Sequence, residues 1–103
     1  MNKNCVTLTG RIAFEPKTFE TKNGGMIASI TMNSYIGKDK DGKAQYMGIG
    51  VKTFDAKAAE ALKNLGKGAD IIVVGRLNAE SYEKDGKTVN VINIIADYIG
   101  VEA

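Results

Sequence analysis

The side chains that most often carry out acid–base, nucleophilic or metal chemistry are sparse in this sequence. It has no histidine and one cysteine, Cys5, so the usual general base and a thiolate metal site are both missing. Five of its six glutamates are scattered among lysines without a paired-carboxylate pattern: Glu15, Glu20, Glu60, Glu80 and Glu83. Gly24-Gly25 and Gly48-x-Gly50 match neither glycine-rich phosphate-binding motif, and we interpret them as turn and bend glycines. The sequence therefore predicts a protein that is not an enzyme and uses no metal or cofactor.

Length and charge limit the other classes of protein. The 103 residues fit one domain, 1–103, and a net charge of +2 does not indicate binding to a polyanion through charge alone. The longest apolar run, Ile71–Val74, is far shorter than the ~18 residues of a membrane span. A single cysteine and the lack of an apolar N-terminal stretch favour a reducing, cytoplasmic location. A domain this small buries only about 60–70% of its unfolded surface, which favours association between copies.

Hydrophobic periodicity predicts five strands and one helix. Alternation with a period of two predicts strands over 4–14, 26–35, 45–53, 71–81 and 88–101. The stretch between the first two strands, with Pro16 and Asn23-Gly24-Gly25, is predicted as a loop, and hairpin tips are predicted at 38–43 and 83–87. A helix is predicted from its N-cap Asp55 to Leu65, ahead of Gly66.

The order of these elements favours one architecture. Three strands, a helix and two more strands form the OB-fold, a five-stranded Greek-key barrel with the helix between strands three and four. We therefore predict an all-β fold with one helix. OB-folds often hold oligonucleotides or oligosaccharides on the face of their second and third strands, but architecture alone does not fix a function.

Four groups of residues follow one another in a specific order across nearly the whole chain. They are Asn2-Lys3 with Val6–Ile12; Gly24–Met32; Lys57–Leu62 with Leu65–Gly68; and Gly75-Arg76-Leu77 with Ser81-Tyr82 and Asp85-Gly86-Lys87. In this order they resemble the single-stranded-DNA-binding proteins of bacteria and their phages. The resemblance implies a groove in which bases stack on aromatic rings while lysine and arginine follow the phosphates. Stacking tolerates any sequence because every base has a π-face.

The resemblance also implies which aromatic residues stack, and because tryptophan is absent they must be tyrosine or phenylalanine. The candidates are Tyr82, Tyr46, Phe54 and Tyr35. Phe54 precedes Glu60 by six positions where the family has five, so Lys52 is the alternative occupant of that position. Tyr46 and Tyr82 could instead be ordinary surface or interface tyrosines, and Phe54 a hydrophobic staple ahead of the helix.

The remaining aromatic residues and the basic residues are assigned other roles. We assign Phe14 and Phe19 to core or loop packing, and Tyr98 to the core or an interface. The predicted phosphate-binding side chains are Arg11, Lys22, Lys52, Arg76 and Lys87, with plain solvation as the alternative for each. The lysines at 38, 40 and 43 alternate with Asp39 and Asp41, which cancels much of their field.

The function implied by the resemblance is sequence-independent binding and protection of single-stranded DNA during DNA replication, recombination or repair. The expected partners are single-stranded DNA, further copies of the chain in a dimer or tetramer, and replication or recombination proteins. The alternative is an OB-fold primosomal or replisome accessory protein that acts through protein–protein contacts, and a third reading is an RNA-binding OB domain.

The end of the chain departs from the family pattern. Cellular members carry a long tail with a short acidic, apolar motif that recruits other proteins, whereas this sequence stops at Gly100-Val101-Glu102-Ala103. We expect a minimal member, from a phage or mobile element, that reaches protein partners by another surface. Removal of a tail from a longer chain is the alternative.

Overall fold

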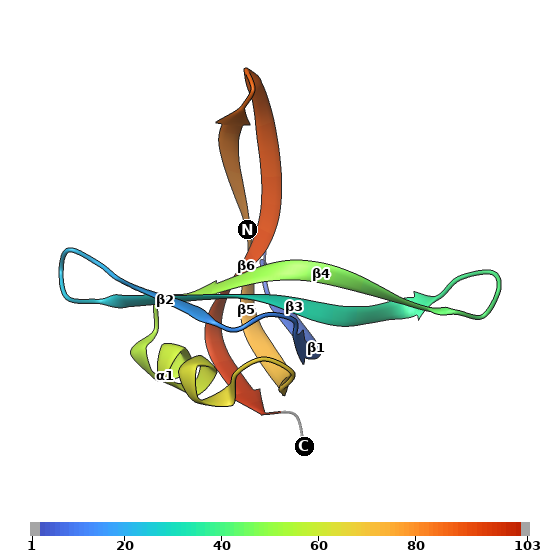
Figure 1. Cartoon of the computed structure of the whole chain (residues 1–103), viewed down its shortest axis with the longest axis horizontal. Coiled ribbons are helices and arrows are strands. Elements are labelled where there is room, and N and C mark those ends of the chain that lie inside the picture. The colour runs from blue at the N-terminus through green and yellow to red at the C-terminus, as the bar shows by residue number, and fades with distance from the viewer. Residues whose placement is uncertain (1–2, 102–103) are drawn as a thin grey trace.

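The computed structural model describes residues 3–101 and shows a closed β-barrel with one helix packed against it (Figure 1). Its elements are β1 (Val6–Ile12), β2 (Lys17–Glu20), β3 (Met26–Lys38), β4 (Ala44–Thr53), α1 (Ala56–Leu65), β5 (Asp70–Lys84) and β6 (Lys87–Val101). The predicted all-β OB-fold with one helix is confirmed. Asn2, Glu102 and Ala103, cited above for the resemblance and for the chain end, lie outside the described residues.

Five of the strands close the barrel. They lie in the order β1-β5-β6-β4-β3, and a short pairing of β1 with β3, where Arg11 is the partner of Asn33, joins the two edges. All neighbours are antiparallel except β4 and β6, which run parallel with Gly50 beside Asn93. A parallel neighbour needs a long connection, which α1 and β5 supply between these two strands.

The predicted loop between the first two barrel strands contains a strand, and that prediction was wrong in this part. β2 pairs with the start of β3, Phe19 facing Ile27, and Gly24 with a φ of 80° turns the chain between them. The backbone N–H of Gly25 donates to the Thr21 hydroxyl in this turn, at 2.9 Å. All four residues of β2 are exposed, so no alternation of apolar and polar residues marks it in the sequence.

Three hairpins project from the barrel: β2–β3, β3–β4 and β5–β6 (Figure 1). They explain why β3 continues to Lys38 and β5 to Lys84, beyond the predicted strand ends. Most residues of the outer halves of β3 and β5 are exposed on both faces. The burial pattern that sequence periodicity detects is therefore absent from them.

The core lies inside the barrel and under α1. Inward residues of β3, β4, β5 and β6, such as Met32, Val51, Ile71 and Ile94, are fully buried. Asp55 caps α1 as predicted, because its carboxylate accepts a hydrogen bond from the Ala58 backbone N–H at 3.0 Å. No helix among the described residues is long and apolar enough to cross a membrane.

Candidate nucleic-acid interface

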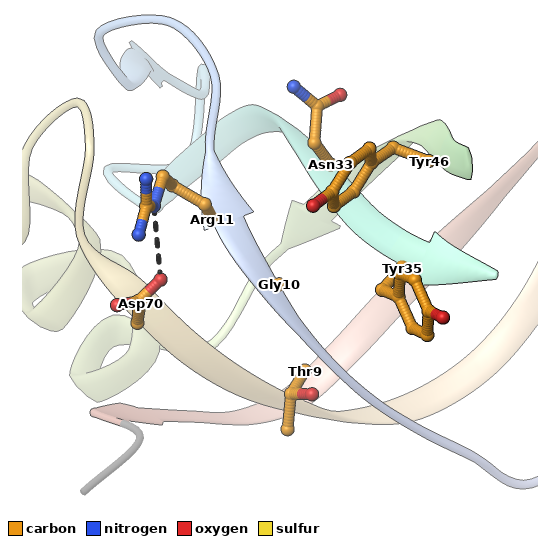
Figure 2. A pocket seen from close by; sticks show the side chains of 7 residues that line it. All are labelled: Thr9, Gly10, Arg11, Asn33, Tyr35, Tyr46 and Asp70. Atoms are coloured by element: carbon orange, nitrogen blue, oxygen red, sulfur yellow. Dashed lines mark hydrogen bonds and ion pairs between the residues drawn. The ribbon is translucent and has the colours of Figure 1, made fainter. Parts of the chain in front are cut away.

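An open depression of about 500 Å³ lies on the outer surface of the barrel, across β1, β3 and β4 (Figure 2). It is lined by Thr9, Gly10, Arg11, Asn33, Tyr35, Tyr46 and Asp70. Strand alternation explains the polar lining, since Met32 and Ser34 point into the barrel while Asn33 and Tyr35 point out. The depression is therefore formed by the outward side chains of strands whose inward side chains build the core.

Tyr35 and Tyr46 form one side of this depression. They are cross-strand partners in β3 and β4, and their ring centroids lie 5.9 Å apart at an interplanar angle of 66°. The edge-to-face contact fixes the two rings while leaving each more than half exposed, at 54% and 64%. Next to Tyr46 on the same face, Gly48 and Gly50 carry no side chain above the sheet. Flat ligands could thus reach both rings from solvent.

Arg11 and Asp70 form the other side. They are partners across β1 and β5, and the Arg11 Nε donates to an Asp70 carboxylate oxygen at 3.2 Å (Figure 2). Both side chains are more than half exposed, so the pair is solvent-screened and weak. The guanidinium can therefore exchange this carboxylate for another anion at small cost.

Two more of the predicted phosphate-binding side chains are paired within the chain. Lys52 Nζ contacts both carboxylate oxygens of Glu80, at 2.9 and 3.1 Å, and Arg76 lies 4.0 Å from Asp97. Lys22 and Lys87 lie at the tips of the β2–β3 and β5–β6 hairpins. Neither forms an ion pair with any residue between 3 and 101. Of these four side chains, Lys52 and Arg76 are thus paired with carboxylates, and within the described part of the chain Lys22 and Lys87 are not.

The Lys52–Glu80 pair belongs to a polar network between β4, β5 and β6. Asn78 donates one amide hydrogen bond to the buried Asn93 at 3.1 Å and a longer one to Glu80 at 3.4 Å. The hydrogen bonds from Lys52 are the main reason that the pKa of the Glu80 carboxyl lies below its ordinary value. Glu80 therefore remains ionised, and holds Lys52, down to a lower pH than a free glutamate would.

Tyr82 lies in the β5–β6 hairpin, 51% exposed, and does not line the depression. Alternation along β5 places it on the face of Glu80, and alternation along β4 places Tyr46 on the face of Lys52. Because Lys52 contacts Glu80, the two tyrosines lie on one outer surface. Phe54, 58% exposed, follows the last residue of β4 and is at the opposite end of that strand from Tyr46.

Sequence reasoning missed three polar residues of the depression. Thr9 and Asn33 could have been found, since each lies two positions from a predicted site residue on the same strand face. Asp70 could not, because its place beside Arg11 depends on the register between β1 and β5. Among residues 3–101 no three side chains of the metal-ligating types cluster together.

For three aromatic residues the predicted alternative of a core position is wrong. Phe14, Phe19 and Tyr98 are 64%, 54% and 57% exposed, so none of them belongs to the core. Phe14 lies in the connection after β1, and Phe19 lies on the fully exposed β2. For Tyr98, the alternative of an interface residue stays a prediction.

Comparison with known proteins gives a consistent result. A model of the single-strand binding protein family matches residues 3–101. The single-stranded DNA-binding protein of Mycobacterium bovis is 29% identical over 103 residues, covering 92% of this chain and 62% of that protein. Single-stranded DNA-binding protein 1 of Staphylococcus aureus Mu50 is 33% identical over 100 residues, covering 93% and 63%. The chain thus spans less than two thirds of the length of these relatives.

Two solved structures share the fold. An SSB of Plasmodium falciparum in complex with ssDNA superposes with a TM-score of 0.84 at 19% identity, covering 100% of this chain and 97% of that chain. A small single-stranded DNA-binding protein of Streptomyces coelicolor gives 0.78 at 20% identity, covering 99% and 96%. The barrel, its helix and its hairpins are therefore an architecture found in experimental structures.

Proposed function

Because this chain belongs to the single-strand binding protein family, we propose that it binds single-stranded DNA through the depression between β1, β3 and β4. The observation that carries the proposal is the pair of exposed, mutually fixed rings of Tyr35 and Tyr46 opposite the Arg11 guanidinium. Unpaired bases can stack on the rings, at about 1–3 kcal/mol per base, while the guanidinium contacts a phosphate. Neither contact reads the edge of a base, so binding is sequence-independent.

The hairpins extend this site. Tyr82 offers a further ring on the same outer surface, and Phe54 offers one beyond the end of β4. The remaining phosphate contacts come from Lys22 and Lys87 at the hairpin tips and from Lys52 and Arg76 once their carboxylate partners are displaced. In this proposal the protein coats exposed strands in the cytoplasm during replication, recombination or repair, as self-associated copies and without catalysis.

A titration with oligonucleotides tests the proposal. Oligo-dT should quench the tyrosine fluorescence with nanomolar to micromolar affinity at moderate salt, because Tyr35 and Tyr46 are the stacking surfaces. A duplex of equal length should bind much more weakly, since its bases are already stacked on one another. An end-labelled oligonucleotide should remain intact during the incubation, and the mass in solution should exceed that of one chain.

Three other outcomes of this titration would favour a different function. Absence of binding to any single strand would favour the accessory protein that acts through protein contacts. A preference for RNA over DNA of equal length would favour an RNA-binding domain. Turnover of the labelled strand would contradict the non-catalytic assignment.

The Lys52–Glu80 pair provides a second test. Glu80→Gln removes the carboxylate that occupies Lys52, so DNA affinity should rise by about two- to fivefold, the range of an exposed ion pair. The salt dependence should steepen as well, because each added phosphate contact changes the slope of log K against log salt by about 0.7 for single strands. The measurement is a set of titrations at several salt concentrations.

Glu83→Gln is the matched control for this variant. Glu83 is exposed on the same strand and forms no ion pair with the residues that the structure describes. Its replacement by glutamine changes the net charge by the same amount as Glu80→Gln does. Equal effects of the two variants would show that Lys52 is not involved. Lowering the pH should not mimic Glu80→Gln near neutrality, because the lowered pKa means that the pair is lost only as the pH falls through that reduced value.

A further inference from the structure

Three exposed phenylalanines lie at the end of β3 opposite to Tyr35. Phe14 lines a shallow depression of about 180 Å³ together with Lys17, Ser29 and Thr31, among others. Phe19 is the cross-strand partner of Ile27. Phe54 follows Thr53, the partner of Ala28, which puts it at the level of Ile27 in the register. The rings are 64%, 54% and 58% exposed, so the described chain uses none of them as core.

This phenylalanine surface, Phe14, Phe19 and Phe54, is continuous with the tyrosine depression. From Ile27 to Tyr35 the odd-numbered residues of β3 point outward: Ile27, Ser29, Thr31, Asn33 and Tyr35. Asn33 and Tyr35 line the first depression, and Ser29 and Thr31 line the second. At about 3.3 Å per residue, Tyr35 lies ~13 Å from Thr31 and ~26 Å from Ile27. One extended ligand on the outer face of β3 would therefore meet the tyrosines first and the phenylalanines next.

Two lysines beside the phenylalanine surface are available to contact phosphates. Lys17 lines the depression beside Phe14, and Lys22 lies in the turn that follows β2. No carboxylate of residues 3–101 forms an ion pair with either lysine. The carboxylate that also lines this depression belongs to Glu15, which lies near Gly66 at the end of α1. Flat rings beside free cations are the combination that holds unpaired nucleotides.

We infer that Phe14 and Phe19, with Phe54 at their edge, form a second nucleobase-stacking site that binds the continuation of the same single strand. This inference rests on the proposed function, since the tyrosine site anchors the strand. The first site and the second together set how many nucleotides one subunit occludes. Bases at the second site stack on phenylalanine and their phosphates contact Lys17 and Lys22.

A length series separates the two sites. The double variant F14A/F19A should bind short oligo-dT, about four nucleotides, like the unchanged protein. For about twelve nucleotides it should lose roughly 25-fold or more in affinity, since each of the two lost stacks removes a factor of about five or more. Its affinity should also stop rising at a shorter oligonucleotide length. If the shortest strands bind too weakly, the comparison uses the shortest length that gives a measurable affinity.

Two controls accompany the series. F14L/F19L keeps the apolar surface without the flat rings, so it should lose the same long-strand affinity if stacking is responsible. Both phenylalanines are exposed, so thermal unfolding of the variants should match that of the unchanged protein.

The outcomes are distinguishable. If F14A/F19A binds long and short strands as the unchanged protein does, the second site is refuted while the first stands. If it loses affinity equally at all lengths, the phenylalanines do not form a separate continuation of the path. If the unchanged protein binds no single strand at any length, the proposed function itself fails.

Discussion

Replacing Tyr35 and Tyr46 together by alanine should weaken binding to oligo-dT by about 2–6 kcal/mol, because each ring stacks one base at about 1–3 kcal/mol. The rings are in contact with each other, at 5.9 Å between centroids. The losses of binding free energy in the two single variants should therefore not sum to the loss in the double variant. Anisotropy of a fluorescently labelled oligonucleotide measures the loss without depending on the tyrosines as reporters.

Conservative variants at the same positions separate stacking from other roles. Tyr35→Phe and Tyr46→Phe keep the ring and remove the hydroxyl, so they should retain nearly the full affinity. Because both side chains are more than half exposed, the alanine variants should remain folded. A folded double-alanine variant with unchanged affinity would show that the depression is not the binding site.

Gly75→Ala should lower the free energy of unfolding by about 3 kcal/mol or more, at the upper end of what overpacking costs. Gly75 sits at the irregularity where β5 pairs with β6. A Cβ there would overlap the carbonyl oxygen of Ile95 and lie 2.8 Å from the Cα of Ala96. Both obstacles are backbone atoms, so no side-chain rotation relieves the clash. Urea denaturation monitored by circular dichroism measures the change.

Gly50→Ala is the matched control in the same barrel. A Cβ at Gly50 would meet only the Cβ of Asn93 at 3.6 Å, an ordinary contact. Since glycine weakens a strand through its conformational freedom, alanine at this position should be neutral or slightly stabilising. Equal urea midpoints of unfolding for Gly75→Ala and Gly50→Ala would mean that β5 and β6 do not approach each other as closely as the structure shows.

The barrel itself was predictable because its strands are half buried. Met32, Val51 and Ile71 alternate with outward residues, and this alternation carries the period that sequence analysis detects. The helix was equally clear, since Asp55 forms the expected cap. β2 and the outer parts of the hairpins escaped detection because both of their faces meet solvent. Hydrophobic periodicity arises from burial of one face of a strand, so it is absent from segments in which neither face is buried.

The candidate site was predictable only residue by residue. Alternation placed Tyr46 and Arg11 on outward faces, but their neighbours depend on long-range register. Tyr35 meets Tyr46 directly although β3 and β4 shift register immediately afterwards, between Tyr35 and Gly37. The salt bridge between Arg11 and Asp70 likewise joins residues 59 positions apart. The sequence left core and loop packing open for Phe14 and Phe19, and their exposure in the structure excludes the core.

The parallel pairing of β4 with β6, together with the other long-range contacts of the barrel, also has a kinetic consequence. The Thr53 hydroxyl donates to the Ala96 carbonyl across 43 positions of sequence, and Asn4 bonds Leu77 across 73. Contacts of this kind form only after long stretches of chain have been ordered, so proteins rich in them reach the native state in roughly milliseconds to seconds instead of microseconds. Newly made chains would then expose unpaired strand edges during that interval, when a second copy can pair with them.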